Sequence, residues 1–402
     1  MTTPRAPLTG GALIAGAMMI SNVAVYGFSV AAARMLLPAE LGAVTALLGL
    51  LLMGSVLSLG LQAATARRIA VDPDHRDDIC RTTVRVVLVA GCLMGAIVAA
   101  STFVLSPALK LGSPWAVVLC GVVLLPLTVM GAAAGIAQGT GRWRTLAAIY
   151  VANGAGRFVG GVVALMINPS APSAMIGIAV GALLPVLAGW PVLRGHVGGS
   201  SQVSSRPFVR EAVLGSHTLL AFFVLSNLDV LIARNLFEEH TSGLYAAGVI
   251  LAKAALFTPQ FVSVVLFPDL ARATDRSTRT RALAAVAGIG AVTVLGTFAL
   301  SSVALALVGG DQYVAIQDRL WLFALSGAML SIVHLLVFDA LARHRHGVGL
   351  ALWLGSAALL AAAYGLDVDL TGLVVTVIAV ATALATWTGL NPRILRGHAP
   401  VS

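Results

Sequence analysis

The chain has 402 residues, of which 58% are hydrophobic and only 10% are charged, and its mean hydropathy is +0.95. Soluble proteins of this size do not have so apolar a composition, so a membrane protein is expected. The net charge of +9 does not indicate nucleic-acid binding, because the basic residues are spread over short loops and not gathered on one domain.

Twelve apolar runs are long enough to cross a bilayer. A helix of about 20 apolar residues spans the hydrocarbon core, and helices satisfy their own backbone groups in lipid. The first run is interpreted as a retained span, because it is too long for a signal peptide. An all-α polytopic membrane protein is therefore predicted, with spans at 10–33, 41–61, 86–109, 115–137, 145–167, 174–193, 212–234, 242–264, 282–308, 319–341, 348–364 and 370–389.

The longest loop, 194–211, is rich in glycine and serine and is typical of a flexible linker. It separates two predicted six-helix bundles, 1–193 and 212–402. The two halves also share a pattern: an Ala-Arg pair ends the outward span, a glycine opens the return span, and a second Ala-Arg pair follows it. These positions are Ala33-Arg34, Gly42 and Ala66-Arg67 in the first half, and Ala233-Arg234, Gly243 and Ala271-Arg272 in the second. A repeat with a cavity between its halves is expected.

Basic residues predict the orientation of the spans. If the N-terminus is in the cytoplasm, the only basic residues placed outside the membrane are Arg34, Lys110, Arg234 and Arg319. The inside takes Arg5, Arg67, Arg68, Arg76, Arg81, Arg85, Arg142, Arg144, Arg194, Arg206, Arg210, Arg272, Arg276, Arg279, Arg281, Arg343, Arg345, Arg393 and Arg396. The positive-inside rule then places both termini in the cytoplasm. The expected location is the cytoplasmic (inner) membrane.

Two cations lie near the middle of predicted spans, Arg157 in 145–167 and Lys253 in 242–264. A cation at the centre of a bilayer costs at least about 2.5–3.5 kcal/mol, so it usually faces a protein interior or a wet cavity. An arginine fork suits phosphate or carboxylate. The alternatives are structural: a pair with a carboxylate of a neighbouring helix for Arg157, and a salt bridge to Asp229 for Lys253.

Other polar residues within the spans are weaker candidates. Asp229 is a candidate for ion coupling or for pairing with a cation, and Arg234 is close enough in sequence to reach it. His334 is a candidate proton relay, although such histidines more often bond a helix carbonyl. Asn22 and Asn153 either line a substrate path or bond between helices. The spacing Gly156–Gly160 indicates tight helix packing.

No set of residues points to catalysis or to a cofactor. The chain has no Walker A motif and no grouped Ser/His/Asp or Cys/His set, so it is not expected to be an enzyme. Cys80, assigned to a loop, and Cys92 and Cys120, assigned to spans, suggest neither a disulfide nor a metal site. The run Arg343-His344-Arg345-His346 is interpreted as a cytoplasmic stop signal, not as a metal site.

The order of motifs resembles that of the Wzx-type polysaccharide flippases, within the superfamily of multidrug, oligosaccharidyl-lipid and polysaccharide exporters. The resemblance rests on Ala33–Gly42, Ser58–Gln62 and Ala66–Arg68 in the first half, and on Asn227–Asp229, Ala233-Arg234, Gly243–Ala247, Lys253 and Leu266–Ala271 in the second. It implies two bundles around a cationic cavity that turns a polyprenyl-pyrophosphate-linked oligosaccharide to the outer leaflet by alternating access. Arg157 and Lys253 are then the implied headgroup-binding residues, and Asn22 and Asn153 are added as further substrate-binding candidates.

The implied partners are the lipid-linked glycan, membrane lipids, and a glycan polymerase or glycosyltransferases, without nucleic acid. Lipid II flippases of the superfamily have two further spans, which favours the polysaccharide role. Two alternatives stay open: an ion-coupled exporter of small molecules or drugs, and a membrane scaffold of a glycan synthase that transports nothing.

Overall fold

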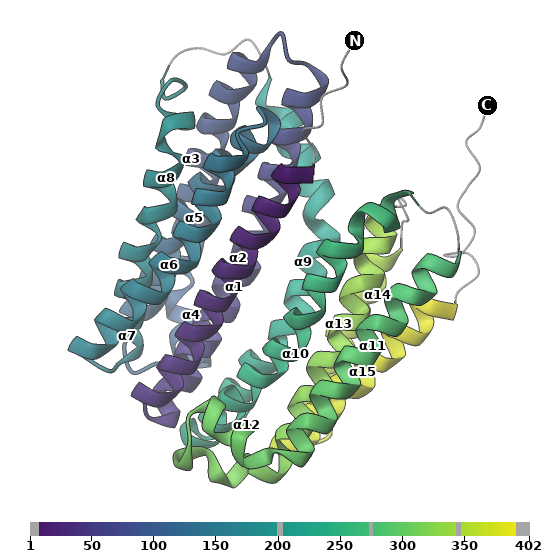
Figure 1. Cartoon of the computed structure of the whole chain (residues 1–402). Coiled ribbons are helices and arrows are strands. Elements are labelled where there is room, and N and C mark those ends of the chain that lie inside the picture. Colours follow the sequence, from purple (N-terminus) through teal and green to yellow (C-terminus); the bar gives the residue numbers. More distant parts are fainter. Residues whose placement is uncertain (1–7, 199–203, 273–275, 343–346, 391–402) are drawn as a thin grey trace. The chain divides into compact units, whose positions relative to one another are not determined.

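The computed structural model describes the backbone of residues 8–198, 204–272, 276–342 and 347–390, and the side chains of residues 10–198, 204–257, 280–341 and 347–388. Figure 1 shows that the regular elements in these residues are helices. The predicted basic run Arg343–His346 and residues 199–203 of the predicted linker lie outside the described residues, as do the predicted inside residues Arg5, Arg393 and Arg396.

The helices before residue 199 are α1 (Leu8–Met35), α2 (Pro38–Val71), α3 (Arg76–Ala100), α4 (Thr102–Ala108), α5 (Trp115–Gly139), α6 (Trp143–Ile167), α7 (Ala171–Gly181) and α8 (Leu183–Leu193). Those that follow are α9 (Ser205–Leu236), α10 (Glu239–Arg272), α11 (Arg276–Ala299), α12 (Ser301–Val308), the 3-10 helix η1 (Asp311–Arg319), α13 (Leu320–Ala342), α14 (Val348–Gly365) and α15 (Leu370–Leu390).

The predicted fold class is confirmed. Among the described residues, 11 helical segments are long and apolar enough to cross a membrane, and each overlaps one of eleven of the twelve predicted spans. The remaining predicted span, 242–264, falls within α10, which is a continuous helix of 34 residues. The side chains of its second half are not among those described.

Three predicted spans are interrupted where a single helix was expected. The span 86–109 begins earlier, at Arg76, so Cys80 lies in α3 and not in a loop, and it breaks at Ser101. There the Ser101 and Thr102 hydroxyls bond the Val98 and Ala99 carbonyls and so compete with the helical bonds. The spans 174–193 and 282–308 break at positions 182 and 300. At the first of these, Pro185 has no N–H to donate to the Gly181 carbonyl.

The order and lengths of the helices support the predicted repeat. Both α2 and α10 have 34 residues, and each follows its preceding helix after two residues. In each half a long third helix is followed by a short one, α4 or α12. The paired glycines also have a physical role: Gly42 of α2 and Gly243 of α10 lie against each other, and a Cβ on Gly243 would collide with the backbone of Pro38.

The chain divides into two compact units. Unit 1 comprises Met1–Leu36 and Leu47–His217, and unit 2 comprises Leu37–Ala46 and Thr218–Ser402. Both α2 and α9 therefore contribute their first turns to one unit and the rest to the other. The predicted bundles 1–193 and 212–402 and the predicted linker 194–211 stay a prediction.

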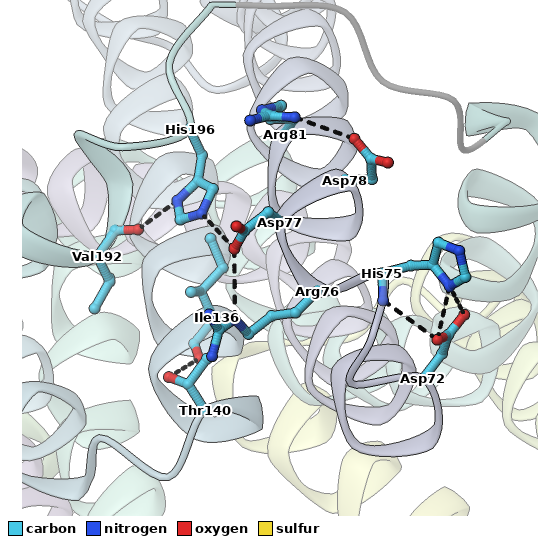
Figure 2. Close-up of polar contacts among 10 residues, drawn as sticks. All are labelled: Asp72, His75, Arg76, Asp77, Asp78, Arg81, Ile136, Thr140, Val192 and His196. Carbon is cyan, nitrogen blue, oxygen red and sulfur yellow. Dashed lines mark hydrogen bonds and ion pairs between the residues drawn. The ribbon is translucent and has the colours of Figure 1, made fainter.

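Polar contacts tie together the ends of helices in unit 1 (Figure 2). His196, which follows α8, has its Nε2 atom 3.5 Å from Asp77 Oδ1 near the start of α3. In the loop between α2 and α3, His75 Nδ1 lies 3.0 Å from Asp72 Oδ1. This hydrogen bond raises the pKa of His75 and lowers the pKa of Asp72, because each charged form stabilises the other.

Candidate functional site

Arg157 lies on α6, which is held between α1 and α7 by glycines. Added Cβ atoms on Gly156 and Gly160 would collide with the carbonyls of Gly181 and Gly177 on α7. Gly154, on the other side, lies against the backbone of Ser21 on α1. The predicted role of the Gly156–Gly160 spacing in tight packing is confirmed, and it is the small-residue packing typical of membrane helices.

The guanidinium of Arg157 has unused hydrogen-bonding capacity. Its Nε atom is buried and, among the residues that the structure describes, has no hydrogen-bond partner. Its Cζ atom lies 5.9 Å from the ring centroid of Phe28, which is fully buried on α1. The face of an aromatic ring attracts a cation but is a poor hydrogen-bond acceptor. Arg157 is therefore able to accept an anion in a fork geometry.

Asn153 lies on α6 four residues before Arg157, and Asn22 lies on α1 where that helix contacts α6. Each is half-buried, and each is adjacent in sequence to one partner of the Ser21–Gly154 contact between α1 and α6. The structure thus brings their two helices together near Arg157. Their predicted role in substrate binding stays a prediction.

Lys253 has a hydrogen-bond partner that was not predicted from the sequence. Its Nζ atom donates to Oδ1 of Asn227, a buried side chain of α9. Asn227 in turn donates to the Phe223 carbonyl at 2.8 Å and to Ser226 Oγ at 3.2 Å. The side chain of Lys253 is half-buried and its orientation is fixed by this chain of bonds. The polar triplet at 226, 227 and 229 was the available signal for this partner.

Asp229 is 8% exposed and accepts a hydrogen bond of 2.9 Å from the Tyr245 hydroxyl at Oδ2. Its Oδ1 atom is buried and has no hydrogen-bond partner within the described part of the chain. Tyr245 was also missed as a site residue; it packs edge-on against Phe323 of α13, with ring centroids 5.2 Å apart.

Arg234 and His334 are buried side chains that contact neighbouring helices. Arg234 is 2% exposed and donates to Ser242 Oγ at 2.9 Å, and it lies 3.9 Å from Glu239. Both of these partners belong to the turn into α10 and to its start. His334 is buried on α13, where its ring stacks on Phe222 with centroids 4.6 Å apart. Its predicted role in ion coupling, like that of Asp229, stays a prediction.

A buried polar network in unit 1 was not predicted. Gln62 of α2 donates through Nε2 to the Tyr150 hydroxyl at 2.8 Å and to Gln138 Oε1 at 3.2 Å. The side-chain amide oxygen of Gln62, Oε1, is buried and has no hydrogen-bond partner among the described residues. Tyr150 lies on α6 seven residues before Arg157, which places the two on the same face.

The two central cations belong to different units, Arg157 to unit 1 and Lys253 to unit 2. Each unit thus has its own polar site within apolar helices. In unit 2 the site joins α9 to α10 through Asn227, Asp229, Tyr245 and Lys253. The prediction that both cations face one cavity stays a prediction.

Comparison with known proteins identifies the fold. No family model and no curated protein matches the chain. The inward-facing conformation of a multidrug resistance MATE family transporter of the MOP superfamily matches with a TM-score of 0.71 and 11% identity, over 95% of this chain and 96% of that one. Lipid II flippase MurJ, in an inward closed conformation, matches with a TM-score of 0.74 and 11% identity, over 94% and 86%. The eukaryotic MATE transporter AtDTX14 gives 0.58 and 15%, over 95% and 94%.

At these identities the similarity shows the fold alone. The chain has the all-α polytopic fold shared by these transporters.

Proposed function

We propose that the chain is a membrane transporter of the Wzx type that moves a polyprenyl-pyrophosphate-linked oligosaccharide to the outer leaflet by alternating access. The observation that carries the proposal is Arg157, a cation in an apolar helix whose Nε atom is buried and makes no hydrogen bond among the described residues. A cation kept in this state is suited to an anionic ligand that arrives and leaves.

The second cation adds to the same chemistry. Unit charges 4 Å apart attract by about 4 kcal/mol at an effective dielectric constant of 20, compared with about 1 kcal/mol in water. A pyrophosphate that leaves water needs such compensation. Arg157 and Lys253 supply two positive charges, and Asn227 holds the second in place.

The fold is consistent with this proposal, because a lipid flippase and multidrug transporters share it. We further propose that the protein resides in the cytoplasmic membrane with both termini in the cytoplasm. A glycan polymerase or glycosyltransferases would then be its partners, supplying or consuming the lipid-linked glycan.

The test uses the purified protein in proteoliposomes and a fluorescent polyprenyl-pyrophosphate-linked monosaccharide. A membrane-impermeant quencher measures how much of the probe has crossed. Arg157→Ala and Lys253→Gln are expected to reduce crossing at least about 30-fold, because removing one partner of a buried charged pair costs about 2 kcal/mol or more. Lys253→Arg should retain more activity than Lys253→Gln, and Arg157→Lys should be damaging because the fork geometry is lost.

Arg144→Ala is the matched control, since Arg144 is exposed at the start of the same helix. In this variant the probe should cross at the wild-type rate. If the probe crossed at the wild-type rate in Lys253→Gln and Arg157→Ala, and both variants were folded, the basis of the proposal would be removed. The absence of crossing by the wild type would instead favour the scaffold of a glycan synthase.

A second candidate function is ion-coupled export of a small molecule. It is favoured by Asp229, a buried carboxylate with one oxygen that has no hydrogen-bond partner among the described residues, and by the fold shared with multidrug transporters. In this case Asp229→Asn would abolish transport of a cationic dye driven by an ion gradient. Arg157→Ala would leave that transport unchanged, which separates the two functions.

A further inference from the structure

Gln62 presents a buried polar atom that needs a donor. The side chain is 7% exposed, and both N–H groups of its amide are used, one by Tyr150 and one by Gln138. The remaining carbonyl oxygen has no hydrogen-bond partner within the described residues. Leaving a buried acceptor unpaired is unfavourable, so the position calls for a group from outside this network.

The choice of amide orientation does not remove this requirement. Oxygen and nitrogen of a glutamine side chain are assigned from the hydrogen bonds. With the Gln62 amide turned over, its oxygen would accept from the Tyr150 hydroxyl, and its nitrogen would become the buried atom in need of a partner. In either orientation one terminal atom of Gln62 is available to a ligand that both donates and accepts.

The network extends to an exposed residue, Gln138, and is aligned along α6 with Arg157. Gln138, at the end of α5, is exposed, and Tyr150 is half-buried. Tyr150 and Arg157 lie on one face of α6, separated by seven residues, or about 10.5 Å at 1.5 Å per residue. Asn153 lies between them on the same face. A diphosphate at Arg157 joined to a sugar ring toward Tyr150 would occupy such a stretch.

We infer that Gln62, Tyr150 and Gln138 form a second binding position, for the hydroxyl groups of the sugar next to the pyrophosphate. This inference rests on the proposed function. Sugar hydroxyls both donate and accept, as the Gln62 terminus and the Tyr150 hydroxyl require. Arg157 would hold the charge of the headgroup, and the Gln62 position would distinguish a headgroup with a sugar from one without.

The experiment measures binding of two lipids to the purified full chain in nanodiscs: a short polyprenyl pyrophosphate, and the same lipid with one hexose. Wild type should bind the hexose-bearing lipid more tightly. Tyr150→Phe and Gln62→Met should each weaken binding of that lipid about fivefold or more, as expected for the loss of one hydrogen bond. Both variants should bind the bare lipid as wild type does, and Arg157→Ala should weaken binding of both lipids.

Thr83→Val is the control, because it replaces by a methyl group a buried hydroxyl of the same unit that pairs with Thr65 and lies outside this network. It should not change the preference for the hexose. Thermal unfolding of every variant separates lost binding from lost folding, and Tyr150→Phe keeps the ring that packs in the core.

Equal binding of the two lipids by wild type, or an unchanged preference in both variants, would overturn the sugar position while the proposed function stands. A wild type that binds neither lipid would overturn the proposed function, and the sugar position with it.

Discussion

Single residues in the two units compensate their buried charges differently. Lys253 is bonded to Asn227, and Asp229 to Tyr245, so both ions of unit 2 have fixed partners. Arg157 of unit 1 has the Phe28 ring and a buried Nε without a hydrogen bond among the described residues. The charged side chains of unit 2 are therefore held by hydrogen bonds, whereas the guanidinium of Arg157 in unit 1 lies near an aromatic ring.

The bond between Tyr245 and Asp229 is expected to stabilise unit 2. Tyr245→Phe would leave both carboxylate oxygens without a neighbouring hydroxyl, so we expect a loss of about 1–3 kcal/mol of unfolding free energy. Asp229→Asn keeps an acceptor for Tyr245 and should cost less. The double variant should lose less than the sum of the two single losses, because the variants remove one shared interaction. Equilibrium unfolding in mixed micelles measures all three.

The matched control is Tyr364→Phe. The Tyr364 hydroxyl also donates to a side-chain oxygen, Asn235 Oδ1 at 2.7 Å, but Tyr364 is exposed. Its removal should change the unfolding free energy by no more than about 0.5 kcal/mol. Equal losses for Tyr245→Phe and Tyr364→Phe would show that burial of Asp229 does not set the energetics of this pair.

At the scale of helices, small residues decide which backbones meet. Gly156 and Gly160 on α6 face Gly181 and Gly177 on α7, and each would place a Cβ against the opposite carbonyl. The Gly181 carbonyl cannot accept the usual helical bond from residue 185, because Pro185 has no N–H. The break between α7 and α8 and the close approach to α6 therefore occur at one place, next to Arg157.

Gly156→Ala is expected to destabilise the protein by about 1–3 kcal/mol, because the methyl group would overlap the Gly181 backbone and force α6 and α7 apart. Gly288→Ala provides the comparison: Gly288 lies inside α11 with open space around it. There the higher helix propensity of alanine should give no loss and up to about 1 kcal/mol of gain. Thermal unfolding of both variants in detergent measures the difference.

The same melting temperature for Gly156→Ala and Gly288→Ala would contradict the role of close α6–α7 packing. A drop for Gly288→Ala alone would contradict it as well.

At the scale of the whole chain, hydropathy alone predicted the all-α fold and the positions of eleven spans, since apolar runs of this length have one stable form in lipid. Breaks at Ser101 and Ala182 were missed because they depend on local backbone competition within an uninterrupted apolar run. Arg157 and Lys253 stood out because charge is rare there. Gln62 and Tyr245 did not, because uncharged polar residues gain significance only from the partners that the fold brings to them.

The predicted orientation of the whole molecule rests on 19 basic residues at inside positions against four outside, and it is open to a direct test. In a background with Cys80, Cys92 and Cys120 replaced, single cysteines are introduced as Asp311→Cys and Ser204→Cys, at two exposed positions. A membrane-impermeant maleimide added to intact cells should label the first and not the second. Permeabilised cells should show labelling of both, which controls for reactivity. The reverse pattern in intact cells would place the termini outside. It would also invert the direction in which Arg157 and Lys253 meet a lipid headgroup from the cytoplasmic leaflet.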